Sequence, residues 1–129
     1  MNSYRRERLI EIAKTLQDFR TGRSLHCAFI LNKNQLLCYA VNSYSKENLH
    51  YRFGQYIGKY NKGFYKSGRH AEAEVVRYYI SKFGNNDMSR LTLFVTRISK
   101  KGEVMYSKPC HNCEKNIIVP NNFKEIIWT

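Results

Sequence analysis

The chain has 129 residues, of which 43% are hydrophobic and 25% are charged. This length and composition favour one globular domain over residues 1–129, and no apolar run approaches the roughly 20 residues that span a membrane. The 22 lysines and arginines outnumber the 10 aspartates and glutamates, so the formal net charge is +12. Such a charge favours a nucleotide or a nucleic acid as partner and says nothing of the fold. With a charged N-terminus and no disulfide scaffold, we expect an intracellular protein, cytoplasmic or nuclear.

The first predicted element is an amphipathic helix from Ser3 to Arg20, within an N-terminal segment that covers residues 1–22. Its apolar residues recur at helical spacing: Leu9, Ile12, Ala13, Leu16 and Phe19. Charged side chains fill much of the opposite face. Gly22 is a plausible stop signal for this helix.

Two apolar runs follow, Leu25–Leu31 and Leu36–Val41, and they predict a β-hairpin with a polar turn of four residues between them. Both runs are almost continuously apolar, so we expect the sheet to be covered on both faces. The residues expected in or near the core are His26, Cys27 and Cys38. A second metal site built from the two cysteines is an open alternative.

Residues 43–69 form a basic, tyrosine-rich insertion with five tyrosines, six lysines or arginines and one glutamate. Rings interleaved with cations suit single-stranded nucleic acid, because the rings can stack on bases while the cations follow the backbone. A solvated surface loop is the equal alternative. Glycines at four positions argue against a long regular element here.

The remainder of the chain alternates helices and strands. The predicted elements are a helix over His70–Phe83, a strand over Leu91–Ile98, a short strand over Val104–Tyr106, a helix from about Cys110 to Ile118 and a strand over Phe123–Trp128. A helix, a hairpin and then alternating elements predict a three-layer α/β/α domain.

Four residues in the second half of the chain have the chemistry of a catalytic metal site. His70 supplies an imidazole, and Cys110 and Cys113 supply thiolates that share one face at the start of a helix. Zinc is well served by these three ligands, with the fourth position left for water. Glu72 lies two residues beyond the histidine and is not needed as a ligand.

The motif H-x-E, followed after 36 residues by P-C-x-x-C at Pro109–Cys113, resembles the zinc-dependent cytidine and deoxycytidylate deaminase superfamily. The resemblance runs from His26 to the C-terminus. It implies a cytidine-deaminase-like fold and a Zn²⁺ held by His70, Cys110 and Cys113. Zinc-bound hydroxide would attack the amine-bearing ring carbon, and Glu72 would shuttle the protons.

The resemblance also implies substrate contacts, which we assign to Asn42, Arg69 and Ala71. Asn42 follows the second strand and would contact the sugar or base, and Arg69 would meet a phosphate. Family members usually continue with another helix and strand beyond the last strand predicted here. We therefore expect either a trimmed deaminase with a short C-terminus or a homo-oligomer that covers the open edge.

The motif favours deamination of a cytosine-type nucleoside or nucleotide, such as CMP or dCMP. An alternative is a deaminase that acts on cytosine or adenine in single-stranded DNA or RNA, with residues 43–69 as the binding segment. A zinc-stabilised nucleic-acid-binding module without turnover is a further alternative, which the carboxylate of Glu72 disfavours. A redox CxxC pair is a minor one.

Overall fold

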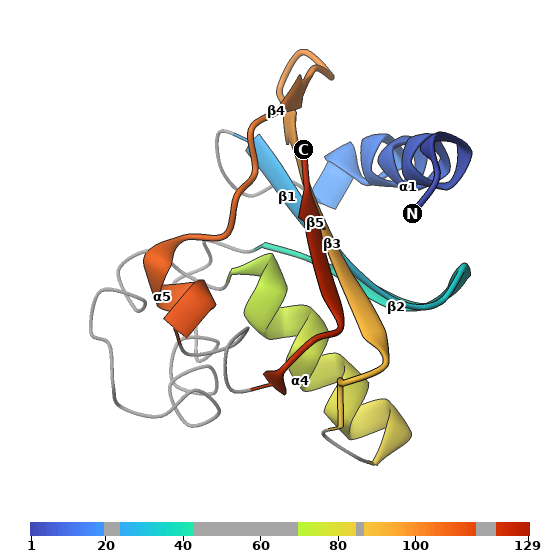
Figure 1. Cartoon of the computed structure of the whole chain (residues 1–129). Coiled ribbons are helices and arrows are strands. Elements are labelled where there is room, and N and C mark those ends of the chain that lie inside the picture. Colours follow the sequence, from blue (N-terminus) through green and yellow to red (C-terminus); the bar gives the residue numbers. More distant parts are fainter. Residues whose placement is uncertain (20–23, 43–69, 85–86, 116–120) are drawn as a thin grey trace.

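The structure, a computed structural model, describes residues 1–19, 24–42, 70–84, 87–115 and 121–129 (Figure 1). The helical elements are α1 (Ser3–Thr15), the 3-10 helix η1 (Gln17–Phe19), α4 (Ala71–Phe83) and the short α5 (His111–Cys113). The strands are β1 (Ser24–Asn32), β2 (Gln35–Val41), β3 (Leu91–Ser99), β4 (Val104–Met105) and β5 (Glu125–Trp128). None of the described helices has the length and apolar character needed to cross a membrane.

The five strands form one mixed sheet in the order β2-β1-β3, with β4 and β5 both pairing with β3 (Figure 1). β1 is antiparallel to β2 and to β3. β5 is parallel to β3, so the chain has to cross from one end of the sheet to the other between these two strands. The crossing carries Cys110 and Cys113. Its path is therefore what brings the two cysteines to the level of α4.

The sheet is covered on both faces, as the nearly continuous apolar strands predicted. Alternate residues of β1, such as Cys27 and Phe29, pack in one buried cluster with Leu9 and Ala13 of α1. The residues between them, Ala28 and Ile30, belong to a second cluster with the buried face of α4. Successive strand residues point to opposite faces, so one strand contributes to two cores. The predicted three-layer α/β/α fold is confirmed.

The hairpin turn is tighter than the sequence predicted. Asn32 pairs with Gln35, so the loop consists of two residues and the expected four-residue turn is wrong. Lys33 adopts a φ of 57°, in the left-handed region. Two-residue hairpin loops with positive φ match the right-handed twist of the strands, and this match outweighs the absence of glycine here.

The N-terminal helix is shorter than the predicted Ser3–Arg20. Its first turn is capped by Asn2, whose side chain accepts a hydrogen bond from the backbone N–H of Arg5 at 2.8 Å. α1 ends at Thr15, and the chain continues into η1, where Nε2 of Gln17 donates to the carbonyl oxygen of Ser99 at 3.0 Å. This contact with β3 holds the chain after α1, a tertiary effect that periodicity does not reveal.

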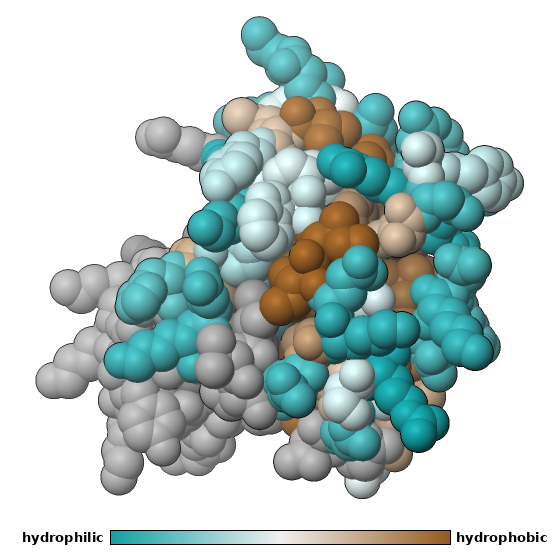
Figure 2. All heavy atoms as spheres, viewed as in Figure 1, coloured by the Kyte–Doolittle hydropathy of each residue, from teal (hydrophilic) through white to brown (hydrophobic). Residues whose placement is uncertain are grey.

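Strand β5 lies along one side of the described sheet. Figure 2 shows apolar residues gathered where β5 runs in the middle of the view, with hydrophilic residues around them. Ile126 packs against the α4 cluster and Ile127 against the α1 cluster, and both are only half-buried. Within the described residues no strand pairs with the other side of β5. A homo-oligomer at this edge stays a prediction.

Candidate active site

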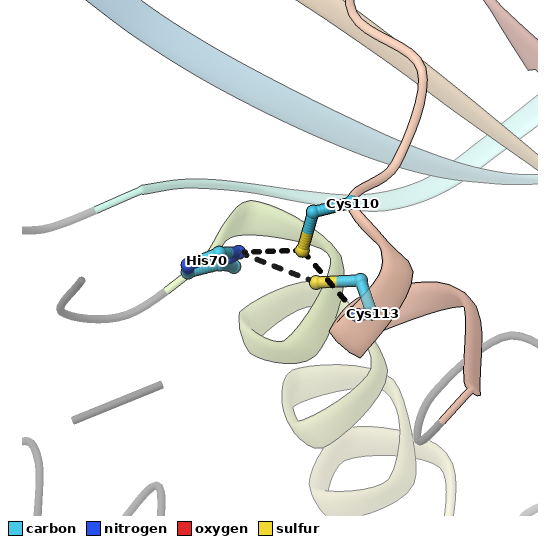
Figure 3. A group of neighbouring side chains, drawn as sticks. All are labelled: His70, Cys110 and Cys113. Carbon is cyan, nitrogen blue, oxygen red and sulfur yellow. Dashed lines mark hydrogen bonds between the residues drawn. The ribbon is translucent and has the colours of Figure 1, made fainter. Parts of the chain in front are cut away.

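The N-terminus of α4 positions His70. This residue is the N-cap of the helix and has an extended backbone, and its side chain makes no capping hydrogen bond. Its imidazole is directed instead toward the turn that begins α5 (Figure 3). Helix α4 itself is fixed by an apolar face that contacts β1 and β2, and it ends at Gly84 with a φ of 72°.

The start of α5 positions the two cysteines. Cys110 is the N-cap of this short helix, and its sulfur accepts a hydrogen bond from the backbone N–H of Cys113 at 3.4 Å. Cys113 is fully buried within the α4 cluster, whereas Cys110 is exposed. The buried cysteine anchors the turn to the core, and the exposed one lies at the solvent side of the site.

These three side chains converge on one point (Figure 3). Nδ1 of His70 lies 3.5 Å from Sγ of Cys110 and 3.4 Å from Sγ of Cys113. All three candidate ligand atoms lie within 4.8 Å of one another. A tetrahedral zinc site, with Zn–S near 2.3 Å and Zn–N near 2.0–2.1 Å, implies nitrogen-to-sulfur separations of about 3.5 Å. The group therefore fits a zinc ion, and it lacks a fourth protein ligand among the described residues.

Without a metal, the cysteine pair holds one thiolate. A hydrogen bond from the side chain of Cys113 lowers the pKa of Cys110 to about 4, against the effect of burial, and His70 lowers it further. The same hydrogen bond raises the pKa of Cys113, and burial adds to this rise. Burial alone would lower the pKa of His70, but the hydrogen bond and the charge of Cys110 outweigh it and raise the pKa. A metal ion would take the place of the protons in this network.

Glu72 lies in the first turn of α4, and its side chain is only 6% exposed. Burial raises its pKa, while a hydrogen bond from its own backbone and the charge of His70 oppose that rise. A buried carboxyl group with a raised pKa can hold a proton and release it, as an acid-base catalyst must. It is not part of the convergent group of three ligands.

Asn42 follows β2 and is almost completely buried. Its backbone N–H donates to the carbonyl oxygen of His26 at 3.0 Å, and its Oδ1 accepts from the backbone N–H of His26 at 2.9 Å. Nδ2 of Asn42 is buried and has no hydrogen-bond partner among the residues that the structure describes. Asn42 thus joins the end of β2 to β1. The substrate contact assigned to Asn42 stays a prediction, and Nδ2 is the side-chain donor that would make it.

The other two assigned substrate residues differ in what the structure describes. Ala71 is the first residue of α4 and is fully buried in the α4 cluster. Arg69 lies outside the described residues, as does the whole of the basic insertion over 43–69. The alternative metal site of Cys27 and Cys38 is wrong, because these residues belong to the clusters on opposite faces of the sheet.

Sequence reasoning placed His26 in the core and gave it no part in the site. It is half-buried on β1, in the alternation shared by Ala28 and Ile30, so its side chain lies on the α4 face. Burial and then the charges of Arg97 and His70 lower its pKa to about 4. His26 is therefore a neutral imidazole close to the metal-binding group. The signal in the sequence was the spacing of two residues between His26 and Ala28, which places both side chains on the same face of the strand.

The fold and the site together define a class: a three-layer domain with a cytidine-deaminase-like fold and a His-Cys-Cys group that could hold a metal. No family model and no curated protein matches the sequence. Among solved structures, the chain is similar to guanine deaminase from Bacillus subtilis, with a TM-score of 0.59 and 16% sequence identity. The alignment covers all of this chain and 64% of the guanine deaminase chain.

Proposed function

We propose that this protein is a zinc-dependent hydrolytic deaminase that acts on a cytosine-type nucleoside or nucleotide. The observation that carries the proposal is the convergence of His70, Cys110 and Cys113 beside the buried carboxyl group of Glu72. A purely structural zinc site usually has four protein ligands. A three-ligand group beside a buried acid is the arrangement needed for hydrolysis.

In this proposal His70, Cys110 and Cys113 hold the zinc ion. Zinc, when bound, lowers the pKa of a coordinated water toward about 7 and supplies a nucleophile at neutral pH. Glu72 takes the proton that the water loses and passes it to the ring nitrogen of the base. Glu72 then takes the remaining proton from the hydroxyl group on the ring carbon and gives it to the amine. The carbon–nitrogen bond breaks, ammonia leaves, and the oxygen of water stays on the ring carbon as a carbonyl.

The surroundings of Glu72 support its role in proton transfer. Its carboxyl group is buried, so the protonated form is stabilised relative to a carboxylate in water. A hydrogen bond from the backbone of Glu72 opposes this effect and favours the ionised form. A group that exchanges a proton in each turnover needs both forms within reach near neutral pH.

The base is tested by ammonia release from zinc-loaded protein. The substrates are cytidine, deoxycytidine, their 5′-monophosphates, guanine and short single-stranded oligonucleotides. Guanine belongs in the panel because the similar structure is a guanine deaminase. We expect turnover of a cytosine-type nucleoside or nucleotide. Turnover of guanine alone would contradict the proposed base, and release from no substrate would leave a zinc-binding module as the better description.

A further inference from the structure

A basic cleft of about 470 Å³ opens at the end of β3 next to the turn that leads into β4. Among the described residues, its cationic lining residues are Arg97, Lys100 and Lys101, and Glu103 is its one carboxylate. Lys100 and Lys101 are exposed, and Ser99 shapes the turn that carries them. The three positive charges and one negative charge of these described residues make the cleft suited to an anion.

Arg97 is the fixed cation of this cleft. Its Nε donates a hydrogen bond to Oγ of Ser24 at 3.0 Å, and the contact is partly buried. No carboxylate in the described part of the chain pairs with its guanidinium group. The bond through Nε leaves the two terminal nitrogens as donors, and paired guanidinium donors match the oxygen atoms of a phosphate.

The cleft and the metal-binding group lie on the same face of the sheet. Arg97 is directly paired with His26 in the β1–β3 register, so their Cβ atoms lie about 4.5–5.5 Å apart on one face of the sheet. His26 lies on the same face of the sheet as Cys113, which belongs to the α4 cluster, and its backbone is hydrogen-bonded to Asn42 at 2.9 and 3.0 Å. Because of this shared face, a nucleotide whose base lies at the metal-binding group would extend its phosphate toward the cleft.

We propose that the cleft formed by Ser24, Arg97, Lys100 and Lys101 binds a phosphate group of the substrate. The inference rests on the proposed function and deepens it, because it assigns a phosphorylated nucleoside rather than a free one as the substrate. The phosphate belongs either to a mononucleotide or to the backbone of a single strand. Both sources present phosphate oxygen atoms to Arg97. The phosphate of a mononucleotide is a dianion near neutral pH, and each backbone phosphate is a monoanion.

The test compares the binding of cytidine and of cytidine 5′-monophosphate by calorimetry, in zinc-loaded protein that carries Glu72→Gln to prevent turnover. We expect the monophosphate to bind more tightly than the nucleoside. Arg97→Gln should reduce the affinity for the monophosphate by about 10- to 100-fold, the usual effect of losing hydrogen bonds to a charged group. Affinity for cytidine should not change. The matched control is Arg90→Gln, which removes an arginine lining a different cleft and should affect neither ligand.

The proposal would be overturned if Arg97→Gln reduced the affinity for cytidine and for its monophosphate equally. It would also be overturned if Arg90→Gln weakened the monophosphate as much as Arg97→Gln does. If Arg97→Gln fails to fold, Arg97→Lys replaces it, because lysine keeps the positive charge and an aliphatic stem but lacks the paired guanidinium donors. The binding measurement needs no turnover. Absence of ammonia release from every substrate would therefore defeat the proposed function, while the dependence of phosphate affinity on Arg97 would still decide this inference.

The two sources of phosphate are separated by salt. For a single-stranded oligodeoxycytidine held in the cleft, replacing Lys100 and Lys101 should reduce the slope of log affinity against log salt by about 0.7 per lost contact. For a mononucleotide bound through Arg97, the same change should leave the slope nearly unaltered. Either result supports a phosphate site. If the substitution of Arg97 weakens the binding of neither ligand, the proposal is contradicted.

Discussion

Nδ1 of His70 lies 3.4 Å from Sγ of Cys113, although 43 residues separate the two in the chain. The histidine caps α4, and the cysteine ends α5 within the crossing between parallel strands β3 and β5. Because both residues are fixed by elements that pack in the core, the ligand atoms are held in place before a metal binds. A preformed site of this kind binds metal without a large ordering cost.

We expect the purified protein to contain about one zinc ion per chain, and the double substitution Cys110→Ala, Cys113→Ala to abolish it. The loss should also lower the melting temperature, because metal-binding energy contributes to folding. Metal content and thermal unfolding check both effects. The matched control is Cys38→Ala, a buried cysteine outside the ligand group. Full zinc retention in the double variant would refute the site.

Glu72→Gln should retain zinc and the fold but lose at least about 10²-fold in turnover, as expected for removal of an acid-base group. Glu74→Gln is the matched control, since Glu74 lies in the same turn of α4 and forms an ion pair with Arg77 at 3.3 Å. Steady-state ammonia release measures both variants. Unchanged activity in Glu72→Gln would show that the role assigned to this carboxyl group is wrong.

Alkylation should single out Cys110 in the metal-free protein. Its pKa of about 4 lies below neutral pH, so the reactive thiolate is present throughout the range from pH 6 to pH 8, and the rate should hardly vary there. An ordinary thiol would lose reactivity about tenfold for each unit of acidification in that range. Cys38 is buried and its pKa is raised to about 11, so it should remain unmodified.

Mass spectrometry after iodoacetamide treatment gives the rate for each cysteine. Added zinc should protect Cys110, and a chelator should restore its reactivity. A steep fall in the rate of Cys110 below pH 8 would contradict the lowered pKa. Equal labelling of Cys38 would show that the α4 face of the sheet is more open than its packing indicates.

Zinc affinity should fall on acidification. The pKa of His70 is raised, so its protonated form persists to higher pH than that of an ordinary histidine, and the proton must leave before the imidazole can bind metal. Stability conferred by zinc is therefore present at higher pH and is lost as the pH falls. Competition with a fluorescent chelator at several pH values measures this, and an affinity independent of pH would contradict it.

Asn42→Ala should lower the free energy of unfolding by about 1–3 kcal/mol, because the backbone N–H of His26 would lose its partner in a partly buried position. Urea unfolding of the zinc-loaded protein measures the change. If Asn42 contacts only substrate, the stability will stay at the wild-type value and only the KM will rise. A lower stability together with a higher KM would assign Asn42 both a structural and a binding role.

Local patterns in the sequence were sufficient for most of the described elements. Helix α4 and strand β3 lie within one residue of their predicted bounds, because their apolar residues and the Gly84 terminator act locally. The continuous apolar character of β1 also predicted burial on both faces, since a strand with one wet face would alternate. The three metal-ligand types were recognisable because their chemistry and spacing depend on side-chain identity.

Other features depended on the tertiary structure. The early end of α1 depends on the bond from Gln17 to Ser99, and the tight turn at Lys33 on the twist of the paired strands. The closeness of His26 to the metal-binding group and its pairing with Arg97 depend on strand register. Register aligns residues that are 71 positions apart in the sequence, so no local pattern contains it. For this protein, the sequence alone determined which ligand types and which core-forming elements are present. Only packing of α4 and α5 against one face of the sheet decided which of those side chains meet, because a metal site requires atoms within a few ångströms of each other.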